Sequence, residues 1–169
     1  FLVSPHISAQ LGFCEGSKGD YIFHEDFGQG TVGMALPAGV TSYNFVTGMD
    51  PEDGFYTVAN SIGANITSWH SNLPSTTISN GLALIVNADD VNAGRFYQIA
   101  IPDLCENTSY EFSAFLMNVY DKSSGVCNFQ DIPINVIFEI WDETNSRILK
   151  EGVTGDIASS ATAKWEQYA

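Results

Sequence analysis

The sequence predicts an all-β protein, a two-sheet antiparallel jelly-roll β-sandwich of about nine to eleven strands. Two runs in its second half, 110–119 and 134–141, are rich in aromatic and β-branched residues, which favour strands. In the second run every even position is apolar, whereas the odd positions include Asn135, Glu139 and Trp141. A period of two with one apolar face is typical of a half-buried antiparallel strand.

The other expected strands are short runs separated by turn-forming Gly, Pro, Asn and Asp. They comprise residues 21–27, 41–46, 54–59, 66–70, 81–87, 96–101, 147–152 and 164–168. The run 81–87 is almost continuously apolar, which indicates a buried strand. The sequence contains no convincing amphipathic helix and no internal repeat, so the prediction is all-β throughout.

The composition fits a single domain that can bury a core, since 44% of its 169 residues are hydrophobic and only 15% are charged. The formal net charge is −14, with twenty acidic against six basic residues, and the basic ones are scattered. Nucleic acid and anionic membrane surfaces are therefore poor partner candidates, because both need clustered Lys and Arg. No apolar run reaches the ~18 residues that cross a bilayer, so direct membrane insertion is not expected.

The two ends of the sequence are interpreted separately from its middle. Residues 1–19 form a lead-in, and 1–9 have small residues near position 9 that suit the end of a signal peptide. The sandwich is assigned to residues 20–169. A strand-like alternation begins at 163 and stops at 169, so we expect the natural protein to continue.

Three cysteines, at 14, 105 and 127, cannot all pair within the chain. A strand of eleven extended residues between Cys105 and Cys127 would span roughly 36 Å. A disulfide needs Cα atoms within about 7 Å, so this pair requires the following loop to fold back along the strand. A Cys14–Cys105 pair, or pairing with cysteines beyond residue 169, is favoured.

A set of motifs occurs in a characteristic order along the chain. They are residues 24–30, 53–58, 69, 84–88, 96–97, 104–114, 118, 132–136, 152–156 and 165–168. In this order the sequence resembles the jelly-roll domain of large secreted and surface proteins of Bacteroidetes, of the gliding-motility and type IX secretion kind. That domain is similar to galactose-binding-like and carbohydrate-binding modules. The resemblance covers roughly 20–169, lacks the family's usual last strand, and implies a secreted, extracellular location at the cell surface within a longer parent chain.

The resemblance also implies a structural calcium ion. The segment 24–28 matches the position where such jelly rolls often hold calcium, and Glu25 and Asp26 are the candidate ligands. Carboxylates beside a glycine turn can supply several of the six to eight oxygens that calcium takes. The partner Asp of the family's last strand is missing here. The competing interpretation is a plain solvated strand end.

Sugar recognition needs an exposed aromatic face and planar amides or carboxylates that bind hydroxyl groups. The candidate ligand-binding residues are Trp69, His70, Tyr97, Gln98, Asn135, Glu139 and Trp141. In a sandwich each aromatic is more commonly part of the core. Trp141 is the least core-like because it shares its parity with Asn135 and Glu139, and Trp69 beside His70 at the edge of a polar loop comes second.

Catalysis has little support, because the three histidines are far apart and no Gly-x-Ser-x-Gly motif occurs. The sequence therefore predicts a non-catalytic glycan-binding or adhesion module whose partner is a glycan or cell-surface polysaccharide. A structural spacer without a ligand of its own is the alternative, and an accessory domain of a glycoside hydrolase is a weaker one. Further domains of the same parent chain are expected as neighbours.

Overall fold

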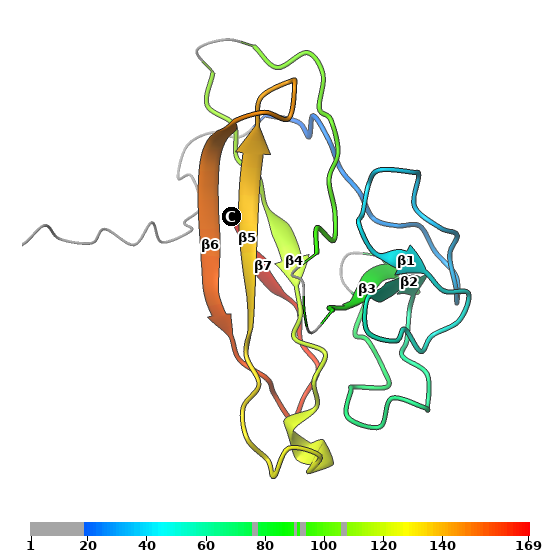
Figure 1. Ribbon diagram of the computed structural model, residues 1–169. Helices are drawn as coiled ribbons and strands as arrows, with labels where there is room; N and C mark the ends of the chain where they lie inside the picture. Colours follow the sequence, from blue (N-terminus) through cyan, green and yellow to red (C-terminus); the bar gives the residue numbers. More distant parts are fainter. Residues whose placement is uncertain (1–18, 76–77, 90, 92–93, 106–107) are drawn as a thin grey trace, which may run out of the picture.

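The computed structural model describes residues 19–75, 78–89, 91, 94–105 and 108–169. Over these residues the chain is nearly all β, with seven strands and one short 3-10 helix, Lys122–Ser124. The strands form two groups that lie on opposite sides of the view in Figure 1. Within the described residues no helix is long and apolar enough to span a bilayer.

The first group is a three-stranded sheet in the order β1-β2-β3. Its strands are β1 (Asn44–Phe45), β2 (Phe55–Ala59) and β3 (Ala83–Asn87), and β2 pairs parallel with β1 and antiparallel with β3. Because β2 is the central strand and has a partner on each edge, four of its five residues are buried, including the polar Thr57. The expected strands at 54–59 and 81–87 are confirmed, and this sheet supplies four of the eight buried hydrophobic residues of the described chain.

The second group consists of two antiparallel pairs (Figure 1). One pair joins β4 (Ala114–Leu116) to β7 (Glu166–Tyr168), and the other joins β5 (Ile134–Trp141) to β6 (Ile148–Ile157). We call β5, β6 and the turn between them the hairpin. The rings of Phe112, which precedes β4, and Phe138 of β5 meet edge to face, with centroids 5.3 Å apart. One face of β5 therefore packs toward the β4 segment.

Short backbone pairings join the two groups. His70 donates its backbone N–H to Val119 at 2.9 Å, and Asp121 donates to Ser68 at 2.8 Å. Next to this junction the buried Asn118 side chain donates to two carbonyls, those of Ile132 (2.7 Å) and Ile157 (3.0 Å). A single amide thus ties the segment after β4, the approach to β5 and the end of β6 together.

Several expected strands are wrong or have different bounds. Segments 21–27, 66–70 and 96–101 form no strand in the described part of the chain, although Trp69 makes one isolated bridge to Tyr120. The run 110–119 is reduced to β4, because only three of its residues find a partner, in β7. The strand expected at 147–152 instead runs from 148 to 157 along β5. Seven described strands form, fewer than the nine to eleven expected.

Candidate ligand-binding face

The hairpin exposes one complete face to solvent. Cross-strand pairs along it are Ile137 with Val153, Glu139 with Glu151 and Trp141 with Ile148. These six residues, which we call the outer face, are all exposed. Side chains alternate between the two sides of a strand, so the outer face points away from the side on which Phe138 meets Phe112. The exposed fraction is 54% for Ile137 and 38% for Trp141.

Trp141 and Glu139 are joined on this face. The indole Nε1 of Trp141 donates a hydrogen bond of 3.0 Å to Oε2 of Glu139, two residues earlier on the same strand. This bond restrains the ring while leaving much of it in water. The result is an aromatic surface with a carboxylate at its edge, which is the combination that sugar recognition requires.

Gln98 lies near the same end of the hairpin. Its side-chain amide donates to the Asn145 side chain at 2.8 Å, in the turn that follows Trp141. Asn135 lies at the other end of β5, where its amide approaches Asp156 at 3.5 Å. Six residues of extended strand separate Asn135 from Trp141 by roughly 20 Å. Of the predicted polar partners, Glu139 is bonded to Trp141, Gln98 contacts the turn at the same end of the hairpin, and Asn135 lies at the opposite end.

Trp69 and His70 lie elsewhere, at the junction between the two groups of strands. Trp69 is half-buried and packs against the core around Ala59, Ile62 and Ile85. His70 is 8% exposed, and its Nδ1 lies 3.9 Å from the Asp121 carboxylate. Both side chains are thus used in packing, and they contribute nothing to the outer face.

Tyr97 also packs within the protein. Its ring meets the Phe27 ring edge to face, with centroids 5.9 Å apart. Partial burial and the neighbouring Glu25 carboxylate, which accepts its hydrogen bond, raise the pKa of the Tyr97 hydroxyl. This arrangement ties segment 96–101 to the segment around Phe27.

The proposed calcium ligands take part in local turns. Glu25 accepts a hydrogen bond from the backbone N–H of Phe27 at 2.7 Å, and Asp26 accepts one from Gly28 at 2.9 Å. The described residues contain no group of three or more acidic, His or Cys side chains placed to hold a metal. Two carboxylates alone do not complete the six to eight oxygens of a calcium site, so they do not fit the ion by themselves. Calcium stays an untested prediction.

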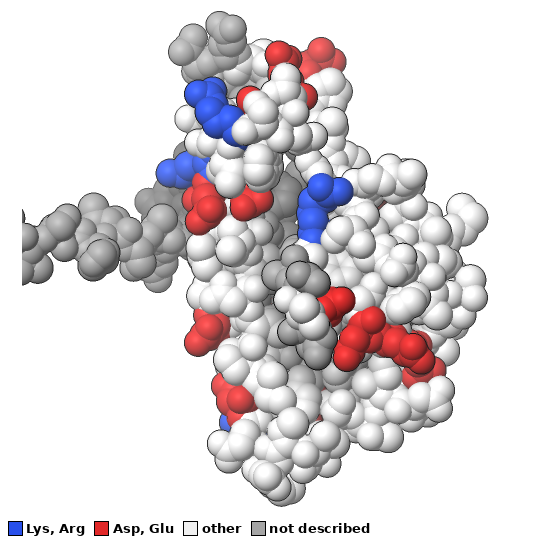
Figure 2. Space-filling view, in the orientation of Figure 1, with Lys and Arg blue, Asp and Glu red and all other residues white. Residues whose placement is uncertain are grey.

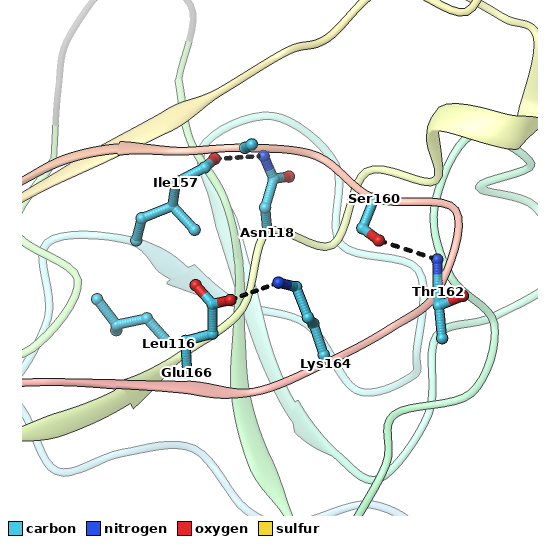
Figure 3. A pocket seen from close by; sticks show the side chains of 8 residues that line it. Leu116, Asn118, Ile157, Ser160, Thr162, Lys164 and Glu166 are labelled. Atoms are coloured by element: carbon cyan, nitrogen blue, oxygen red, sulfur yellow. Dashed lines mark hydrogen bonds and ion pairs between the residues drawn. The ribbon is translucent and has the colours of Figure 1, made fainter.

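A small notch lies between β4, the end of β6 and β7 (Figure 3). An ion pair between Lys164 and Glu166 lies along one wall of it, and the Ser160 hydroxyl accepts a hydrogen bond from the Thr162 backbone at 3.1 Å. The Lys164 ammonium and the Tyr168 hydroxyl lower the pKa of Glu166. The notch has room for about one water molecule, so it cannot enclose a sugar ring.

Glu151 and its neighbour Val153 were missed in the sequence. They join the site only through the strand register, which places Glu151 opposite Glu139. The turn residues at 142–146 were a usable signal, because pairing two strands outward from a turn predicts which side chains face each other.

The described residues test only part of the predictions about the cysteines and the signal peptide. Cys105 and Cys127 are both free thiols, so they are not joined to each other. Cys14 and the suggested signal-peptide segment 1–9 lie outside the described residues.

Comparisons with known proteins found no matching family, no similar curated protein and no similar solved structure. The resemblance to a Bacteroidetes jelly-roll domain therefore stays a prediction.

Proposed function

We propose that this chain is a secreted or cell-surface, non-catalytic module that binds a glycan and contributes to adhesion. The observation that carries the proposal is the exposed Trp141 ring, whose indole N–H is bonded to the Glu139 carboxylate. The apolar face of a pyranose ring can stack on the indole, while carboxylate oxygens accept hydrogen bonds from its hydroxyl groups. Gln98, near the same end of the hairpin, adds an amide for further hydroxyls.

We also propose a fold and a context for this module. The two groups of strands would belong to one jelly-roll β-sandwich, and the module would be one unit of a longer surface protein of the gliding-motility and type IX secretion kind. The ordered motifs in the sequence and the nearly all-β architecture support this proposal. A structural calcium ion at Glu25 and Asp26, which the resemblance implies, belongs to this proposal.

A structural spacer is the competing function. It is favoured by the use of Trp69 and Tyr97 in packing, because these aromatics leave fewer surfaces for a ligand. The two functions differ in what happens at Trp141. A spacer needs no exposed tryptophan, whereas a glycan-binding module loses its platform without it.

The test is a glycan array followed by calorimetry with the wild-type protein, Trp141→Ala and Phe129→Ala. Phe129 is the matched control, an exposed aromatic in the loop that precedes β5, whereas Trp141 ends that strand. We expect Trp141→Ala to weaken binding by about tenfold or more, equal to about 1.4 kcal/mol, with unchanged melting. Phe129→Ala should bind like wild type.

Two results would contradict the proposal. Equal binding by both variants would remove the outer face as the site, and the absence of any glycan ligand would favour the spacer. Hydrolysis of a polysaccharide by the purified protein would contradict the non-catalytic assignment.

A further inference from the structure

Two glutamates occupy directly opposite positions in the middle of the outer face. Glu139 on β5 and Glu151 on β6 are a cross-strand pair, bordered by the apolar pair Ile137–Val153 on one side. Side chains paired in this way have Cβ atoms about 5 Å apart, and like charges so placed destabilise a sheet. Two negative charges at such positions are expected to repel each other.

No positive charge of the described residues neutralises this pair. Neither Glu139 nor Glu151 forms an ion pair with a described residue. The hairpin's Lys150 pairs with Ile140 and so belongs to the other side of the sheet. Figure 2 shows acidic side chains over the hairpin, with basic ones gathered near its upper end. Because no positive charge of the described residues balances them, the two carboxylates create a negative electrostatic potential beside the Trp141 ring.

We infer that the outer face selects glycans that carry free, protonated amino groups. This inference rests on the proposed glycan-binding function and names its ligand class. An ammonium group has three N–H donors, so one amino sugar can donate to Glu139 and Glu151 together in short charge-assisted bonds. The neighbouring sugar ring stacks on Trp141, and the cation gains further from the electron-rich indole.

Charge complementarity separates this ligand class from the alternatives. The whole chain carries a formal charge of −14, so a polyuronate or sulfated glycan is repelled both at the face and at a distance. A neutral glycan can stack on Trp141 but leaves the two carboxylates opposed. Only a cationic glycan relieves the repulsion between Glu139 and Glu151 when it binds.

The experiment compares three glycan probes of equal length by calorimetry: a glucosamine oligosaccharide with free amines, its fully N-acetylated form and a polyuronate. We expect the free-amine probe to bind about tenfold or more tightly than the N-acetylated one, and the polyuronate not to bind. The preference should weaken as salt is raised, because exposed charges are screened.

Glu151→Gln is the decisive variant, because it removes one charge and keeps both Trp141 and Glu139. It should lose the preference for free amines, so that the free-amine and N-acetylated probes bind the variant with similar affinity. Glu143→Gln is the matched control, because Glu143 is an exposed carboxylate in the hairpin turn, outside the outer face. This control should keep the preference.

The outcomes distinguish the inference from the function beneath it. If both sugars bind equally and Glu151→Gln changes nothing, the inference fails and the glycan-binding function stands. An equal loss in Glu143→Gln would mean general charge attraction and would also overturn the assignment to this face. If none of the three probes and no glycan of the array binds, the proposed function fails together with the inference.

Discussion

The central strand of the first sheet and the first strand of the hairpin have similar apolar compositions but opposite environments. In β2 four of five residues are buried, whereas in β5 none of eight is. β2 has a partner on each edge, whereas β6 is the one strand that pairs with β5 in the described part of the chain. An apolar alternation therefore predicts a strand, but it does not predict whether anything covers that strand. The uncovered strand is the one that offers a surface to a ligand.

The largest expected effect is the difference in stability between two isoleucine-to-alanine variants, one in the buried sheet and one on the exposed hairpin. Ile85→Ala should lower the free energy of unfolding by about 2–4 kcal/mol, because Ile85 is 3% exposed and its removal leaves a cavity in the core. Ile137→Ala should change it by no more than about 0.5 kcal/mol, because that side chain is mostly in water. Chemical denaturation of both variants measures the difference.

A large destabilisation by Ile137→Ala would break the comparison. It would mean that the outer face is covered in solution, by a second copy or by residues outside the described part of the chain. Sedimentation of the wild-type protein distinguishes these two explanations, since only the first depends on concentration.

The strands that the sequence predicted well are those whose own residues strongly favour the extended conformation. The run 134–141 forms β5 over the same residues, and 81–87 contains β3, because β-branched and apolar side chains dominate both. Segments 21–27 and 96–101 have a similar composition but form no strand. A strand requires a neighbour at hydrogen-bonding distance, and that neighbour lies far away in the sequence.

The residues of the candidate site also differ in whether the sequence alone could predict their positions. The exposure of Trp141 and Glu139 follows from their parity along one strand, which the sequence displays. The participation of Glu151 depends on pairing across a turn, and the burial of Trp69 depends on contacts with a distant sheet. The periodicity of one strand predicts which of its side chains are exposed. It does not predict which distant residues contact them.

A smaller effect concerns how the second group of strands is held together. Asn118→Ala should cost about 2 kcal/mol of stability, because it leaves the carbonyls of Ile132 and Ile157 without their side-chain donor in a region that is 6% exposed at Asn118. Asn135→Ala is the matched control, since its exposed amide makes only a 3.5 Å contact. It should change stability by about 0.5 kcal/mol or less. Equal effects in thermal denaturation would show that the Asn118 amide does not join these strands.

The smallest expected effect is a loss of stability at low pH that is confined to the second group of strands. Hydrogen bonds from the Ser159 hydroxyl and backbone N–H, at 2.5 and 2.7 Å, lower the pKa of Asp131 from its ordinary value of 3.8. Hydrogen bonds within the hairpin turn, first from the Ser146 backbone, also lower the pKa of Asp142. A lowered pKa contributes stability that is present above the ordinary value and is lost as the pH falls through the folded-state value.

Hydrogen exchange between pH 5 and pH 2 should therefore show the hairpin losing protection before the sheet of β1, β2 and β3. Asp131→Asn removes one titrating group, so it should flatten part of this pH dependence, and Ser159→Ala should do the same by removing the hydroxyl donor. Because both variants act through one hydrogen-bonded pair, the double variant should add little to either single one. Simultaneous loss of protection in both groups of strands would instead show that they unfold as one cooperative unit, so that the contrast between a buried sheet and an open hairpin lies in exposure and not in local stability.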